Sequence, residues 1–127
     1  MAGEALRRYI DLVEAAQAPW GVSQSPIFSQ SLDHHLRIFP DLKEKLAKFV
    51  SVKLPNPLAP QARYGKHDSP MTGPLVGFFH CHLRDDALLI YNLVNRCVNL
   101  VVIVSHAEIE GKRAKLTGKR VAPFLNR

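Results

Sequence analysis

Two periodicities divide the chain into helical and strand-forming parts. Apolar residues recur at helical spacing over residues 4–17, which predicts an N-terminal helix. A short strand is expected at residues 27–29, followed by a helical hairpin in which Ser31 caps the first helix and Pro40 lies near the start of the second. The apolar stripe predicted for the second helix consists of Leu42, Leu46, Phe49 and Val50.

The second half of the chain changes to strand patterning. We expect strands at residues 75–83, 87–94 and 98–104, with a turn at Asn95-Arg96 between the last two. The last two strands are apolar on both faces, so both faces of the sheet should be covered. The pattern predicts an α+β domain in which a small, twisted antiparallel sheet packs against the helical hairpin.

Polar residues gather at one end of the last two strands. Before the first run stand His80, His82, Arg84, Asp85 and Asp86, and after the second stand Ser105 and His106. Antiparallel pairing would make His82 and His106 neighbours at one rim of the sheet. Strand alternation places His80 and His82 on one face, and it lets only one of the two aspartates enter the same site.

Length and composition favour one domain spanning residues 1–127, with one hydrophobic core. The hydrophobic content of 46% is typical of a globular protein. The longest nearly apolar run, Leu100–Val104, is too short to span a membrane, and the start of the chain does not read as a secretory signal. Two cysteines without metal-binding spacing favour a cytoplasmic protein with reduced thiols.

Positive charge accumulates at the C-terminal end. The net charge is +6, and no acidic residue follows Glu110. We therefore separate a basic C-terminal segment, residues 111–127, from an N-terminal helical extension, residues 1–25. A basic segment suits a polyanion or an acidic protein partner, but it equally suits a solvated tail that maintains solubility.

Three readings of the polar cluster stay open at this point. His80 and His82 could bind a metal ion with His106 or Asp86, although no cysteine pair or HExxH pattern supports this. Metal-free cleavage of RNA through its 2′-hydroxyl needs a base, an acid and cations around the phosphate. The residues whose side chains could serve as base, acid or cation are His67, His82, Asp86, His106, Arg84, Lys112 and Arg113. Alternatively, these side chains only cap strand ends.

Two other polar segments carry less information. His34 and His35 lie in the predicted hairpin without ligand spacing, so we interpret them as surface or packing residues. The proline-rich loop at residues 55–74 is long for a compact domain, which favours either a functional loop or a mobile connector.

The stretch from His67 to His106 resembles the RelE/ParE superfamily of bacterial type II toxins, and most of all the YafQ branch of ribosome-dependent mRNA interferases. The family pattern is roughly DH, a glycine, a strand ending in (E/D)xHxxxDxxLIY, and a strand ending in SH or TH. This chain reads KHDSPMTGPLVGFFHCHLRDDALLIY and then VVIVSH. The upstream LDHHLRIFPDLKEKLAKFV resembles the helical hairpin of the family, so the likeness covers about residues 26–110.

The match extends to individual positions. The resemblance implies that the catalytic residues are His82, Asp86, His106 and, across a longer loop, His67. The chain departs from the family pattern at three positions: His80 replaces a carboxylate, Ala87 a tryptophan and Glu110 an aromatic residue. These departures bear on base stacking and codon preference more than on the reaction class.

What the resemblance implies is an endoribonuclease toxin that cuts mRNA in the ribosomal A site by general acid–base catalysis, without a metal or other cofactor. We expect Arg84, Lys112 and Arg113 to contact phosphate. The expected partners are mRNA, the ribosome and a cognate antitoxin with an acidic segment, with no membrane involved. Two alternatives remain: a ParE-like toxin that inhibits DNA gyrase, and a catalytically degenerate member that only binds its antitoxin.

Overall fold

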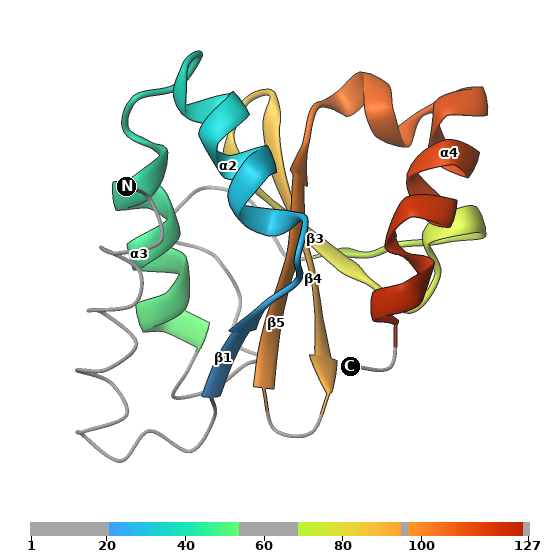
Figure 1. Cartoon of the computed structure of the whole chain (residues 1–127), viewed down its shortest axis with the longest axis horizontal. Coiled ribbons are helices and arrows are strands. Elements are labelled where there is room, and N and C mark those ends of the chain that lie inside the picture. The colour runs from blue at the N-terminus through green and yellow to red at the C-terminus, as the bar shows by residue number, and fades with distance from the viewer. Residues whose placement is uncertain (1–20, 54–68, 95–96, 126–127) are drawn as a thin grey trace.

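A five-stranded sheet lies between two helical layers (Figure 1). The computed structural model describes residues 21–53, 69–94 and 97–125. The predicted N-terminal helix and most of the proline-rich loop, including His67, lie outside these ranges. In chain order the elements are β1 (Gly21–Gln24), α2 (Phe28–Leu36), α3 (Leu42–Lys53), β2 (Ser69–Pro70), η2 (Gly73–Leu75), β3 (Phe79–Arg84), β4 (Ala87–Val94), β5 (Cys97–Val104), η3 (His106–Ile109), α4 (Gly111–Val121) and η4 (Ala122–Phe124).

The predicted α+β fold is confirmed, with one refinement in the sheet. The strand order is β1-β5-β4-β3-β2, and all pairs from β2 to β5 are antiparallel. Strand β1 pairs parallel to β5, which makes the sheet mixed. The two central strands pair antiparallel as predicted: β4 has the expected bounds and β5 begins one residue earlier, at Cys97. The predicted turn at Asn95-Arg96 lies outside the described ranges.

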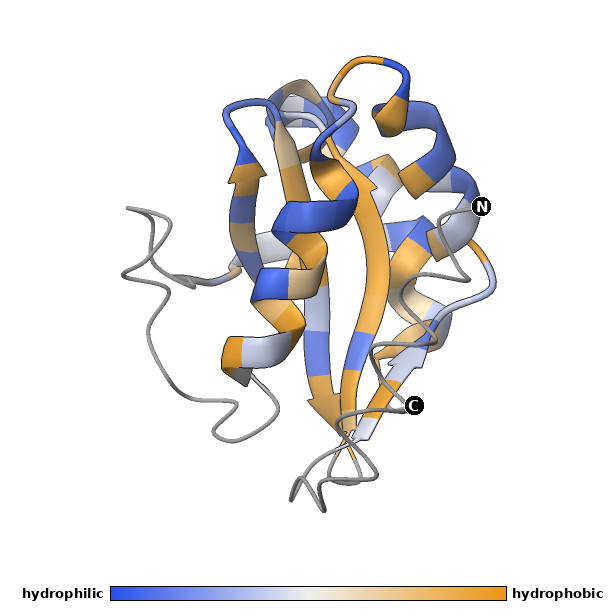
Figure 2. Ribbon diagram, turned by 90° about the vertical axis from the view of Figure 1, so that its left-hand side faces the viewer, coloured by the Kyte–Doolittle hydropathy of each residue, from blue (hydrophilic) through white to orange (hydrophobic). Residues whose placement is uncertain are grey.

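Each face of the sheet has its own hydrophobic core, as the two-sided apolar pattern predicts (Figure 2). Helices α2 and α3 cover one face, and all four residues of the predicted α3 stripe are buried there. Helix α4 and η2 cover the other face. Ile90 pairs with Val102 but Tyr91 pairs with Leu100, so Val101 is an extra residue in β5. This bulge lets two consecutive valines, 101 and 102, face the α4 side.

The prediction for residues 27–31 is wrong. The short strand lies earlier, at β1, and Phe28 already begins α2. Ser31 is a buried residue inside this helix and does not cap it. Its hydroxyl donates to the carbonyl of Phe28 and accepts the backbone N–H of Ile103 at 2.9 Å. Strand β1 ends at Gln24, so on the β1 side of β5 the N–H of Ile103 has no strand carbonyl to donate to. The Ser31 hydroxyl serves as its acceptor instead.

Two further segments differ from prediction. Only residues 79–83 of the expected strand 75–83 belong to β3, because η2 extends to Leu75 and Gly77 has a φ of 96°. The basic C-terminal segment is not a tail over residues 111–121 but helix α4, which buries Ala114, Thr117 and Val121. No helix in the described ranges has the length and apolar content needed to cross a membrane.

Candidate active site

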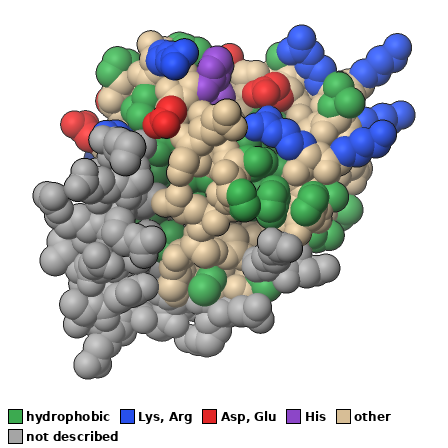
Figure 3. Space-filling view, viewed as in Figure 1, with side chains coloured by type: hydrophobic (Ala, Val, Ile, Leu, Met, Phe, Trp, Pro, Cys, Tyr) green, Lys and Arg blue, Asp and Glu red, His purple; other side chains and the backbone are tan. Residues whose placement is uncertain are grey.

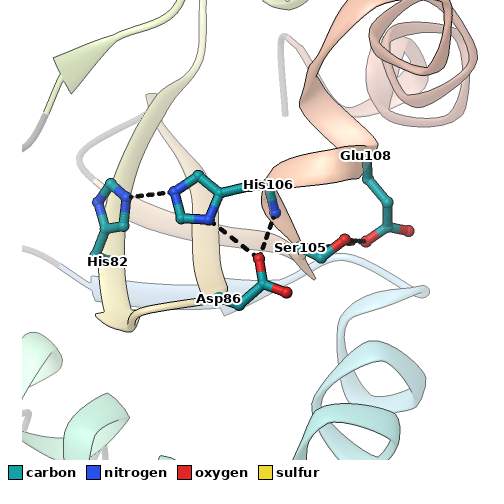
Figure 4. A network of polar contacts seen from close by, with 5 residues as sticks. All are labelled: His82, Asp86, Ser105, His106 and Glu108. Atoms are coloured by element: carbon teal, nitrogen blue, oxygen red, sulfur yellow. Dashed lines mark hydrogen bonds and ion pairs between the residues drawn. The ribbon is translucent and has the colours of Figure 1, made fainter.

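His82, His106 and Asp86 form one hydrogen-bonded row at the rim of the sheet (Figure 4). His82 lies near the end of β3, and Asp86 lies in the turn to β4. His106 begins η3, and Ser105 alone separates it from the end of β5. The Nε2 atoms of the two histidines are 3.0 Å apart, and the Nδ1 of His106 is 3.0 Å from Asp86 Oδ1. His82 pairs with Leu88 on β4, and Leu88 pairs with Val104 on β5, so these three antiparallel strands bring together histidines 24 positions apart. The predicted meeting of His82 and His106 is therefore confirmed.

The contacts restrict where the protons lie. An ionised carboxylate can only accept hydrogen bonds, so the Nδ1 of His106 must carry a proton toward Asp86. Between the two Nε2 atoms one nitrogen donates and the other accepts, since two lone pairs or two protons would repel each other. The row thus holds one proton donor and one proton acceptor next to each other, which is the pair that acid–base catalysis requires.

Asp86 keeps its negative charge readily. Its Oδ1 accepts the backbone N–H of His106 at 2.8 Å as well as the ring N–H. The backbone hydrogen bond first, and the ring hydrogen bond second, hold the pKa of the Asp86 carboxyl below its usual 3.8. A carboxylate in this position orients the imidazole of His106 and fixes the tautomer in which Nδ1 carries the proton.

A capping interaction fixes the backbone of His106. The Glu108 carboxylate accepts the backbone N–H of Ser105 at 2.7 Å, and the Glu108 N–H donates to the Ser105 carbonyl. The Ser105 hydroxyl also donates to this carboxylate at 3.4 Å (Figure 4). The Thr117 hydroxyl on α4 donates to the Glu108 carbonyl at 2.6 Å. Helix α4 therefore supports the turn that presents His106.

The cations predicted to contact phosphate occupy different environments. Arg84 forms an ion pair with Asp41 at 3.3 Å and lies 5.5 Å from the ring centre of Phe39, so part of its charge is already engaged. Lys112 and Arg113 lie exposed on α4. Five Lys and Arg residues and no acid occur in α4, and Figure 3 shows Lys and Arg side chains gathered over this side of the molecule.

Several residues singled out in the sequence lie next to the row. Asp85 is exposed, and Asp86 alone of the adjacent pair bonds to His106. His80 lies beside His82 with ring centres 5.6 Å apart. Of the positions that depart from the family pattern, Ala87 is fully buried in the core and Glu110 is exposed. In the part of the chain that the structure describes, no group of three or more His, Cys, Asp or Glu side chains could hold a metal ion.

His35, interpreted from the sequence as a surface or packing residue, is a packing residue that also lines a pocket. This residue is 5% exposed, and its Nδ1 donates to the carbonyl of Ser31 at 2.9 Å. It lines a pocket of about 320 Å³ that also contains Asp86. Phe28 and His35 lie seven residues apart on α2, and both are buried. This helical spacing was the one signal in the sequence that His35 faces inward.

Comparisons with known proteins agree on one fold. No protein-family model and no curated protein matched the sequence. A metal-bound toxin from Helicobacter pylori is 32% identical, with 70% of this chain and 97% of that chain covered and a TM-score of 0.55. YafQ in the E. coli DinJ-YafQ toxin–antitoxin complex is 24% identical, with coverages of 73% and 99% and a TM-score of 0.59.

A third similar structure widens the range of relatives. The YoeB/ParE toxin from Agrobacterium tumefaciens is 11% identical, with coverages of 67% and 96% and a TM-score of 0.55, and it shows the shared fold alone. The Helicobacter toxin is similar in sequence as well as in fold over nearly its whole length. The chain belongs to the RelE/ParE superfamily of toxins and is YafQ-like.

Proposed function

We propose that this protein is the toxin of a type II toxin–antitoxin system and that it cuts mRNA in the ribosomal A site. The observation that carries the proposal is the row of His82, His106 and Asp86, joined by hydrogen bonds at an open rim. A toxin that acted only by binding would have no need for a paired proton donor and acceptor. The proposal places the protein in the cytoplasm, where its substrate is.

The chemistry uses the 2′-hydroxyl of the RNA as nucleophile. One histidine takes the proton of this hydroxyl, the oxygen attacks the adjacent phosphorus, and the bond to the 5′-oxygen breaks as the other histidine protonates that oxygen. The products are a 2′,3′-cyclic phosphate and a free 5′-hydroxyl. No bound metal is needed for either proton transfer.

Asp86 suggests how the two roles are divided. Its carboxylate lies 3.0 Å from the Nδ1 of His106, where it would offset the positive charge of a protonated ring, and a protonated histidine is a proton donor. We assign the acid role to His106 and the base role to His82. His67, in the segment outside the described ranges, remains a further candidate for the base.

The basic helix α4 supports two partners. Lys112 and Arg113 would stabilise the phosphate, whose negative charge increases in the transition state. The same surface would bind an acidic antitoxin and be covered by it. Two of the similar structures are toxin–antitoxin complexes, DinJ-YafQ and YoeB-YefM.

Cell-free translation tests the proposal directly. The wild-type protein should shorten the mRNA and stop synthesis, whereas the His82→Ala/His106→Ala double variant should leave full-length mRNA intact. Lys48→Ala serves as a control, because Lys48 is exposed on α3, across the sheet from α4. Equal loss of mRNA with both proteins would reject the site, and inhibition of gyrase supercoiling without mRNA loss would favour the ParE-like alternative.

A further inference from the structure

The pocket beside Asp86 is separate from the two histidines of the row. Asp86 lines it, but His82 and His106 do not. Its other walls come from the end of α2 and the segment after it, and from η3 and α4; they are formed by His34, His35, Ile38, Phe39, Ser105, Glu108 and Arg113. A ligand in this pocket would therefore lie next to the reacting phosphate without displacing the catalytic groups.

The pocket offers hydrogen-bond acceptors in excess. The Nδ1 of His35 donates to Ser31, so the Nε2 of the neutral ring carries a lone pair. Each of the two carboxylates has one oxygen that accepts hydrogen bonds, Oδ1 of Asp86 and Oε2 of Glu108. The other oxygens, Oδ2 of Asp86 and Oε1 of Glu108, accept none within the described residues. A bound molecule must therefore bring N–H or O–H donors.

The remaining walls define the rest of the ligand. Ile38 is 59% exposed, which is high for a large apolar side chain, and Phe39 adds aromatic surface. Together they suit a flat, apolar ring. Arg113 places a cation at the pocket, and a phosphate attached to the ring would bind there. An isolated anion fits poorly, because two carboxylates line the same space.

We propose that this pocket binds one base of the RNA strand beside the cut, and that it selects a base with an amino group over uracil. Adenine and cytosine each present an amino group, whereas the pairing edge of uracil has a single N–H between two carbonyl oxygens. These oxygens would face Asp86 and Glu108. His35 acts as a specificity-determining residue, with its Nε2 accepting from the amino group. The identity of the ligand as RNA rests on the proposed function.

Binding of single nucleotides tests the proposal without ribosomes. With methyl-labelled wild-type protein, the Ile38 methyl signal should shift on titration with 5′-AMP or 5′-CMP, while the fully buried Ile90 serves as the internal control. One additional hydrogen bond predicts a Kd roughly three- to tenfold lower for AMP and CMP than for 5′-UMP. Equal affinities for AMP, CMP and UMP would overturn the proposal, as would a site that inorganic phosphate fills equally well.

Three variants separate the pocket from catalysis. His35→Phe keeps an aromatic side chain but removes the ring nitrogens. The Kd for UMP should then exceed the Kd for AMP and CMP by no more than about twofold. Ile38→Ala changes an exposed side chain and should affect folding little. It should weaken the binding of all three nucleotides by a similar factor. His106→Ala should abolish cutting yet keep the preference. If the wild type discriminates between nucleotides but cuts no mRNA, the proposed function fails and the pocket stands; if it cuts but does not discriminate, the pocket proposal fails.

Discussion

Asp86 and His106 are joined twice, because a single carboxylate oxygen accepts both the backbone N–H of His106 at 2.8 Å and its ring Nδ1–H at 3.0 Å. The backbone bond fixes where the carboxylate lies, and the ring bond fixes how the imidazole is turned. The Nε2 atom of His106 is thereby directed at His82 before any substrate arrives. This preorganisation is the central structural feature of the site.

The first prediction concerns acid stability. Because the folded-state pKa of Asp86 is lowered, the folded protein binds the carboxyl proton less readily than the unfolded chain does. The resulting stabilisation is fully present above the usual value of 3.8 and is lost as the pH falls through the folded-state pKa. Asp86→Asn should therefore be less stable than the wild type at pH 6, and the difference should shrink below pH 3.8, as measured by urea unfolding.

The neighbouring aspartate supplies the control for this experiment. Asp85 is exposed and bonds to neither histidine of the row. Asp85→Asn should follow the wild-type curve at both pH values. If the free energies of unfolding of Asp86→Asn and the wild type differed by the same amount at both pH values, the pKa of the Asp86 carboxyl would not be lowered as the contacts indicate.

The second prediction assigns the acid. An RNA in which sulfur replaces the bridging 5′-oxygen at the cut has a better leaving group, which departs without a proton. His106→Ala should recover much of its lost rate on this substrate, because it lacks only the acid, whereas His82→Ala should not recover. The measurement is the cleavage rate of the oxygen and sulfur substrates on programmed ribosomes. Recovery of His82→Ala alone would reverse the assignment.

The third prediction tests helix α4 as the phosphate-binding surface. Removing two cations with Lys112→Gln/Arg113→Gln should weaken RNA binding and lower the slope of log Kd against log salt concentration by roughly 1.4. A filter-binding or fluorescence titration over several salt concentrations gives this slope. Lys48→Gln is the matched control, because Lys48 is an exposed lysine on α3, across the sheet. An unchanged slope in the double variant would remove α4 from the binding surface.

The fourth prediction concerns the packing that holds α4 in place. A Cβ at Gly118 would lie 2.6 Å from the carbonyl oxygen of Pro74, which is backbone and cannot turn away. Gly118→Ala should therefore destabilise the fold by about 1–3 kcal/mol, despite the better helix propensity of alanine. Thermal or urea unfolding measures this change. Leu116→Ala, at an exposed position on the same helix, should change stability little; a stabilised Gly118→Ala would show that α4 can move away from η2 freely.

The sequence allowed prediction of those parts of the fold that periodicity determines. The bounds of β4, the α3 stripe and the meeting of His82 with His106 all follow from spacing alone. The family resemblance then selected Asp86 over Asp85, and the structure shows this carboxylate on His106.

The errors arose where tertiary contacts decide the local structure. Ser31 has the composition of a helix cap, yet the free edge of β5 requires its hydroxyl inside α2. The basic segment 111–127 also suited a solvated tail, but Gly111, with a φ of 54°, turns the chain from η3 into α4. His35 lacks any motif, and only the packing of α2 against the rim places it in a pocket with Asp86.

The most direct test of the account is the rate at which His106→Ala cuts mRNA on programmed ribosomes, compared with the wild type under single-turnover conditions. The variant should remain folded, as judged by circular dichroism and thermal unfolding. Loss of one acid–base group predicts a rate at least about 100-fold lower, with a 2′,3′-cyclic phosphate at the end of the wild-type product. A folded variant that cuts as fast as the wild type would contradict the assignment of the row as the active site.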